Sequence, residues 1–158
     1  MFLIAAEALT PAAPEEAWRL LTDFGRYPLW TRALEIEGAA TPGAPLNYSF
    51  RIWREDGADR RVTFPGIVDV VEPRHEMRWS LGVPAIFDLR FRFALVPGPG
   101  GTVVRHTAEA SGLVADTLRG RLERQLGPAV RAFVADAERA FATRPRSAPS
   151  PTLPERRP

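Results

Sequence analysis

Few side chains in this sequence could carry chemistry, because it holds two histidines and no cysteine. His106 is the more informative histidine. In its extended segment Val104 and Ala108 share its phase, whereas Arg105 and Thr107 take the other phase. Successive side chains of a strand point to opposite faces, so the pattern predicts that His106 lies on the apolar face. An imidazole there could be a buried hydrogen-bonded group, a ligand contact or a general acid–base, since its reference pKa lies near neutrality.

Two further polar side chains are candidates for the same face. Tyr48 is in phase with Leu46 and Phe50, so its hydroxyl could orient a ligand or its ring could simply fill the core. Asp69 lies in an apolar run, directly after Val68. An inward carboxylate there would need a partner and could have a raised pKa.

Large apolar side chains complete the predicted pocket, because ligand pockets are lined mainly by apolar and aromatic groups with a few polar ones. Trp79, Phe91 and Phe93 come from two alternating segments, and Val130 and Phe133 belong to a helical stripe that faces them. The residues predicted to contact a ligand are His106, Tyr48, Trp79, Phe91, Phe93, Asp69, Phe133 and Val130.

The composition gives no support to other kinds of catalytic site. Without cysteine there is no thiolate nucleophile and no thiolate metal ligand. Two histidines alone fall short of a typical zinc site. All 21 basic residues are arginine, which rules out a Schiff-base lysine. We therefore expect no metal and no cofactor.

The net charge of +2 is unevenly distributed along the chain. Residues 143–158 hold four arginines and one glutamate, a net +3, and subtracting this from +2 leaves −1 for residues 1–142. Nucleic-acid binders carry their basic patch on the folded face, so we expect no nucleic-acid partner. No segment approaches the ~20 apolar residues that span a bilayer, and no signal peptide is recognised, which favours a cytoplasmic location. The oligomeric state stays open, a homodimer included.

Periodicity predicts the elements that position these residues. A strand over residues 2–9 precedes a helix that begins at Pro14, a favourable first helical residue. Alternation then predicts six strands, at about residues 34–37, 46–53, 61–71, 76–81, 87–95 and 102–110. Pro65 and Gly66 are expected to interrupt the third of these six with a bulge or bend.

Residues 114–142 carry one continuous apolar stripe at helical spacing, with a kink or break expected at Pro128. Consecutive short strands with tight turns imply an antiparallel sheet with one buried face, which this helix would cover. The sequence therefore predicts one α+β domain over residues 1–142. Residues 143–158 are rich in proline and arginine and are expected to form a disordered tail.

Several strings, in this order, resemble the SRPBCC or START-like superfamily, and its polyketide cyclase/dehydrase branch in particular. The family's opening helix and its break match residues 14–18 (PEEAW) and 27–30 (YPLW). A strand–turn–strand signature matches residues 71–73 (VEP) and 77–79 (MRW). The sequence departs from the family at Thr31, where an Asn–Pro pair often begins.

The resemblance spans about residues 2–142 and implies a helix-grip fold. In that fold a curved antiparallel sheet of about seven strands wraps around a long C-terminal helix, with short helices between strands 1 and 2. Its cavity is commonly ligand-sized, so we expect binding of a small hydrophobic molecule such as a lipid, isoprenoid or polyketide-like aromatic. One alternative is a cyclase or dehydratase in which His106 moves protons. Another is a protein-interaction module whose cavity is filled.

Overall fold

A computed structural model describes residues 1–83 and 85–143. The predicted tail, 143–158, lies outside the described residues except for Thr143. The elements, in chain order, are β1 (Phe2–Thr10), α1 (Pro14–Thr22), the 3-10 helix η1 (Phe24–Leu29), β2 (Leu34–Gly38), β3 (Pro45–Ile52), β4 (Arg60–Glu72), β5 (Glu76–Val83), β6 (Phe87–Gly98), β7 (Gly101–Ser111) and α2 (Leu113–Ala142).

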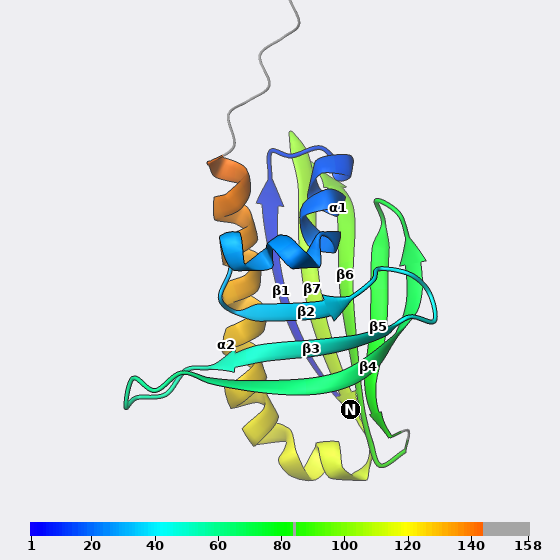
Figure 1. Cartoon of the computed structure of the whole chain (residues 1–158), viewed down its shortest axis with the longest axis vertical. Coiled ribbons are helices and arrows are strands. Elements are labelled where there is room, and N and C mark those ends of the chain that lie inside the picture. Colours follow the sequence, from blue (N-terminus) through cyan, green and yellow to red (C-terminus); the bar gives the residue numbers. More distant parts are fainter. Residues whose placement is uncertain (84, 144–158) are drawn as a thin grey trace, which may run out of the picture.

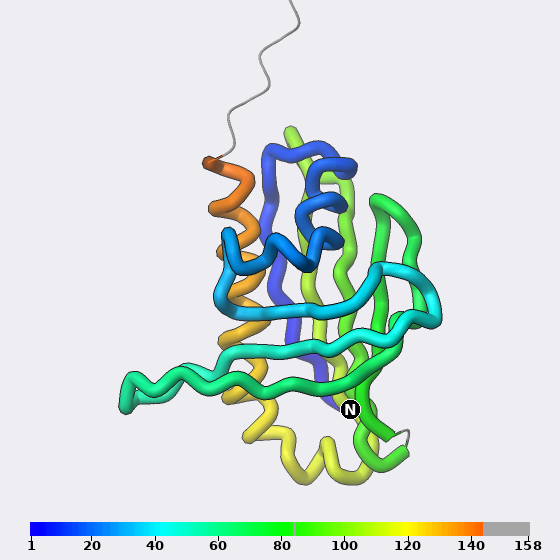
Figure 2. Tube along the Cα trace, viewed as in Figure 1, coloured from blue at the N-terminus to red at the C-terminus, as the bar shows by residue number. Residues whose placement is uncertain are grey.

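Seven strands form one antiparallel sheet in the order β1-β7-β6-β5-β4-β3-β2. Neighbours in the sheet are neighbours in the chain, except that the first strand pairs with the last. The sheet curls strongly, so that β2, β3 and β4 cross in front of the other strands (Figure 1). The β3–β4 hairpin extends beyond the rest of the molecule at the left (Figure 2). The predicted helix-grip fold is thereby confirmed, with β1 and β2 as the edge strands.

The alternation read from the sequence matches the two faces of the sheet. On β7, for example, Val104, His106 and Ala108 are buried and face α2, whereas Arg105 lies on the outer face. The buried side chains of all seven strands meet those of α1, η1 and α2 in one core. The concave side of the sheet and the helix that it holds therefore form the interior of the protein.

The long helix α2 departs from the sequence prediction, because it continues through Pro128 without a break. A proline inside a helix removes one main-chain hydrogen bond, but it need not end the helix when packing holds both sides. Leu126 and Val130 flank Pro128 and are fully buried. The bend of α2 that Figure 1 shows lies in its yellow, N-terminal part, before Pro128.

Strand β4 also differs from its prediction, since no interruption occurs at Pro65 and Gly66. The register shifts instead between Val68 and Val70. Glycine is required at position 66 because β4 approaches β5 closely there. A Cβ atom on Gly66 would lie 2.6 Å from the main-chain oxygen of Ser80.

Between β1 and β2, two short helices close one end of the core. Pro14 occupies the first turn of α1, followed by two glutamates that favour the positive end of the helix dipole. In η1 the buried Tyr27 donates its hydroxyl hydrogen to the main-chain oxygen of Leu21. No helix in residues 1–83 and 85–143 is long and apolar enough to cross a membrane.

Candidate functional site

Five of the predicted site residues form one aromatic cluster on the concave face of the sheet. Tyr48 comes from β3, Trp79 from β5, Phe91 and Phe93 from β6, and His106 from β7, and all are buried. The Tyr48 and Phe91 ring centres lie 4.2 Å apart, and those of Phe93 and His106 lie 4.7 Å apart. These separations are those of rings in contact, so the side chains pack against one another.

The helix α2 closes this aromatic cluster from the other side. The Phe133 ring centre lies 5.2 Å from that of Phe93 and 5.4 Å from that of His106. Val130, one turn earlier, is fully buried on the same stripe. The structure thus brings together seven of the eight residues predicted from the sequence.

The imidazole of His106 is fixed in one tautomer by the neighbouring strand. Its Nδ1 lies 3.1 Å from the main-chain oxygen of Arg92. A carbonyl oxygen can only accept, so Nδ1 carries the hydrogen and Nε2 presents a lone pair. Burial lowers the His106 pKa to about 4, against a smaller opposing effect of the bond to Arg92. The ring is therefore neutral near pH 7 and acts as a hydrogen-bond acceptor through Nε2.

Three polar atoms of the aromatic cluster are buried without a hydrogen-bond partner among the described residues: Tyr48 Oη, Trp79 Nε1 and His106 Nε2. The other buried tyrosine, Tyr27, has its partner in Leu21. Burial also raises the pKa of Tyr48 well above its ordinary value, so its hydroxyl keeps the proton that it could donate. Leaving such a group unpaired costs about 1–3 kcal/mol. The cluster therefore offers two donors and one acceptor to a molecule that reaches it.

Asp69 does not belong to this cluster, which corrects the sequence prediction. Its carboxylate is exposed on the outer face of β4 and accepts a hydrogen bond from the Ser80 hydroxyl at 3.1 Å. The strand phase explains this position. Val68 points inward and is fully buried, and the register shift between Val68 and Val70 leaves Asp69 on the outer face.

The outer face of the sheet is charged and paired, as expected for a surface in contact with water. Each of four arginines there lies close to a carboxylate. The pairs are Arg78 with Glu76 at 3.3 Å, Arg90 with Asp88 at 2.8 Å, Arg92 with Glu76 at 2.5 Å and Arg105 with Glu7 at 2.7 Å. This neutralisation is typical of a solvated charged face rather than of an anion site.

An apolar recess of about 500 Å³ opens between α2 and the strands. We call it the mouth recess. Its lining residues are Ile52, Arg60, Val62, Phe64, Ile86, Phe87, Val114, Leu118, Arg121, Leu122 and Gln125. Sequence reasoning missed this site because its walls come from four separate segments. Two features of the sequence could have indicated the recess, namely the inward phase of β4 and the apolar stripe of α2.

Aromatic side chains connect the mouth recess to the aromatic cluster. Phe64 lines the recess and stacks on Phe50, with ring centres 6.1 Å apart. Phe50 in turn lies 6.2 Å from the ring centre of Tyr48. A row of packed aromatic side chains thus connects the mouth recess to the Tyr48 hydroxyl, which has no hydrogen-bond partner among the described residues.

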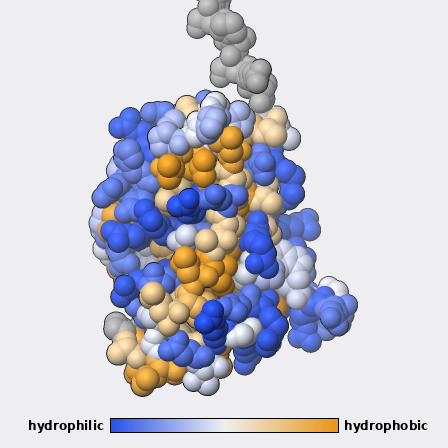
Figure 3. Space-filling model, turned by 180° about the vertical axis from the view of Figure 1, so that it is seen from behind, coloured by the Kyte–Doolittle hydropathy of each residue, from blue (hydrophilic) through white to orange (hydrophobic). Residues whose placement is uncertain are grey.

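Exposed apolar side chains border this end of the molecule. Leu113 is 80% exposed, Val83 57% and Ile86 54%. They belong to the start of α2, the end of β5 and the β5–β6 turn, which lie at the lower end in Figure 1. Figure 3 shows hydrophobic surface at the same lower end. Apolar surface next to an opening is typical of an interaction or ligand-binding site.

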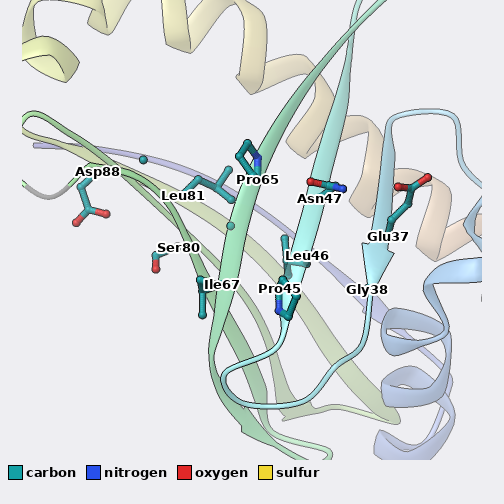
Figure 4. Close-up of a pocket in the computed structure, with 12 residues that line it drawn as sticks. Glu37, Gly38, Pro45, Leu46, Asn47, Pro65, Ile67, Ser80, Leu81 and Asp88 are labelled. Carbon is teal, nitrogen blue, oxygen red and sulfur yellow. The ribbon is translucent and has the colours of Figure 1, made fainter.

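A second recess, of about 610 Å³, lies on the outer side of the sheet where it bends. Figure 4 shows its lining residues, which come from β2 to β6 and include Glu37, Asn47, Ser80 and Asp88. The lining also includes apolar side chains such as Leu46, Ile67 and Leu81, and Asp88 already pairs with Arg90. The apolar share of the lining is larger in the mouth recess, which is therefore better suited to an apolar ligand. Within residues 1–83 and 85–143, no group of three metal-ligating side chains could hold an ion.

Comparison with known families agrees with a fold that encloses an apolar interior. The family model described as "Polyketide cyclase / dehydrase and lipid transport" matches residues 1–144. The chain belongs to this family. The resemblance noted in the sequence is therefore confirmed. The chain has no match among curated proteins.

Solved structures of the family fold are similar to this chain at low sequence identity. Protein TTHA0849 from Thermus thermophilus has a TM-score of 0.66 at 17% identity, over 89% of this chain and 97% of that one. Protein MLL2253 from Mesorhizobium loti has a TM-score of 0.61 at 22% identity, over 89% and 97%. The di-domain ARO/CYC BexL from the BE-7585A biosynthetic pathway has a TM-score of 0.63 at 17% identity, over 91% and 51%. At these identities the likeness concerns the fold.

Proposed function

We propose that this protein binds a small, mostly apolar molecule between α2 and the concave face of the sheet. The observation that carries the proposal is the set of three buried polar atoms without a partner among the described residues, which a row of packed aromatic rings joins to the mouth recess. A ligand with a carbonyl oxygen could accept from Tyr48 or Trp79, and a ligand hydroxyl could donate to Nε2 of His106. Lipids, isoprenoids and polyketide-like aromatics combine such groups with a large apolar surface.

The ligand enters through the mouth recess. Each square ångström of apolar surface that it buries contributes roughly 25 cal/mol. Because the rings of Phe64, Phe50 and Tyr48 lie in a row between the mouth recess and the unpartnered atoms, these side chains must move apart as the ligand reaches those atoms. Ligand binding would then replace the missing hydrogen bonds of the free protein.

The chemistry of His106 favours binding over catalysis. General acid–base groups work best when their pKa is near the operating pH. A pKa of about 4 leaves His106 a weak base at neutrality, and its Nδ1 hydrogen is engaged by Arg92. A cyclase or dehydratase that relies on His106 to carry protons is therefore the weaker proposal. A protein-interaction module would suit the packed cluster but would not account for the unpartnered atoms or the mouth recess.

A thermal-shift screen of the full chain tests this function. The panel contains fatty acids, isoprenoid alcohols, flavonoids and polycyclic aromatic ketones. A ligand present at about 100 times its Kd adds about 2.7 kcal/mol of stability, which raises the melting temperature by several degrees. A flat response of the folded protein to the whole panel contradicts the proposal.

Two tyrosines provide a matched pair of variants. Tyr48→Phe removes a hydroxyl without a partner, so the free protein keeps or gains stability while the ligand-induced shift becomes smaller. Tyr27→Phe leaves the Leu21 oxygen without its donor, so the free protein loses about 1 kcal/mol while the ligand-induced shift is retained. A ligand shift that is equal in both variants would remove Tyr48 from the site.

The expectations about cellular location, partners and oligomeric state remain predictions from the sequence. They are a cytoplasmic location, the absence of a nucleic-acid partner and an oligomeric state that includes a homodimer among its options.

A further inference from the structure

Two arginines line the otherwise largely apolar mouth recess. Arg60 is in the inward phase of β4, together with Val62 and Phe64. Arg121 lies on the face of α2 that also carries Leu122. One arginine thus comes from the strand wall of the recess and the other from the helix wall.

Neither of these arginines forms an ion pair with a described carboxylate, although their neighbours in the chain do. Arg61, on the opposite face of β4, pairs with Glu35 at 3.6 Å. Arg119, two residues before Arg121, pairs with Glu123 at 3.0 Å. The lining of the mouth recess contains no acidic residue, and Gln125 is its one other polar side chain in the part of the chain that the structure describes. The recess is therefore apolar and positively charged at the same time.

We propose that the mouth recess selects an apolar molecule that carries a carboxylate, and that Arg60 and Arg121 bind the carboxylate. This inference rests on the proposed function and specifies its ligand class. The planar guanidinium fork matches the two oxygens of a carboxylate, and such charge-assisted bonds are about twice as strong as neutral ones. The apolar part of the ligand lies against Phe64 and points toward Phe50, with the charged end between the two arginines.

The test compares acids with neutral molecules of the same shape. The probes are decanoate with 1-decanol, and 2-naphthoate with 2-naphthalenemethanol. Isothermal titration calorimetry gives the Kd of each probe for the full-length wild type, for R60Q/R121Q and for R61Q/R119Q. Both double variants lose two positive charges, so they share one net charge and differ only in where the charges are removed. All four arginines are exposed, so both double variants are expected to melt within a few degrees of wild type.

The wild type is expected to bind each acid about tenfold more tightly than its neutral counterpart. R60Q/R121Q loses this preference while its affinity for the neutral probes stays within about twofold of wild type. R61Q/R119Q keeps the preference. Equal binding of acid and alcohol by the wild type, or equal loss of preference in both double variants, overturns the carboxylate inference and leaves ligand binding intact. Failure of the wild type to bind any of the four probes would count against the proposed function itself.

Discussion

The buried imidazole of His106 should make the stability of the fold depend on pH within a defined window. In the unfolded chain a histidine titrates at about 6.5, whereas burial lowers the pKa of His106 in the folded state to about 4. Between these two values the unfolded state binds more protons than the folded state. The stabilisation is therefore complete above about pH 6.5 and is lost progressively as the pH falls toward 4.

The size of this effect follows from the two pKa values. Between pH 7.5 and pH 4.5, the free energy of unfolding should fall by about 2.5 kcal/mol through His106 alone. The free energy of unfolding falls by about 1–3 kcal/mol per molar urea, so this change corresponds to a shift of the urea midpoint on the order of 1 M. Because His106 is fully buried, solvent screening does not reduce it.

Urea unfolding followed by circular dichroism from pH 4.5 to 7.5 measures the effect in wild type, His106→Phe and His75→Gln. His75 is the other histidine of the chain and is exposed, so it serves as the matched control. The carboxylates are the same in all three proteins, so the difference between the wild type and each variant isolates the contribution of one histidine to the pH dependence. We expect His106→Phe to lose about 2.5 kcal/mol of pH dependence and His75→Gln to retain it. A His106→Phe variant with the wild-type pH dependence would refute the assigned pKa and the burial that causes it.

Two further predictions concern the backbone. Gly66→Ala should lower the free energy of unfolding, measured by chemical denaturation, by about 1–3 kcal/mol, because the new Cβ would lie 2.6 Å from the Ser80 oxygen. Gly25→Ala, whose Cβ would have nothing within 4 Å, is the control and should be nearly neutral. Pro128→Ala should restore one main-chain hydrogen bond inside α2 and raise the melting temperature by several degrees, and a lower melting temperature would show that the proline is needed for the packing of the helix.

The sequence predicted the concave face well because strand phase is a local property. Alternation placed Tyr48, Trp79 and His106 on one face, and the structure brings their rings into contact. The same local reasoning could not give the tautomer of His106, because that depends on Arg92 in the adjacent strand. It also could not tell which polar groups would lack a partner, since partners come from distant segments.

The errors occurred where tertiary packing overrides a local preference. Pro128 does not break α2, because the residues on both sides of it are buried against the sheet. Gly66 marks a close approach to β5 rather than an interruption of β4. The mouth recess was missed for a related reason. Arg60 and Arg121 are 61 positions apart, and only the fold shows that they line one opening.

The edge strand β2 limits how copies of this protein could associate. An unpaired edge can template the addition of another strand and so lead to fibres. β2 offers only five residues, two of which are glutamates, and η1 packs against it. It ends at Gly38, whose φ of +137° departs from extended geometry. A second sheet would meet a short edge that η1 partly covers, so continuous sheet formation through β2 is disfavoured and any pairing of subunits is directed to other surfaces.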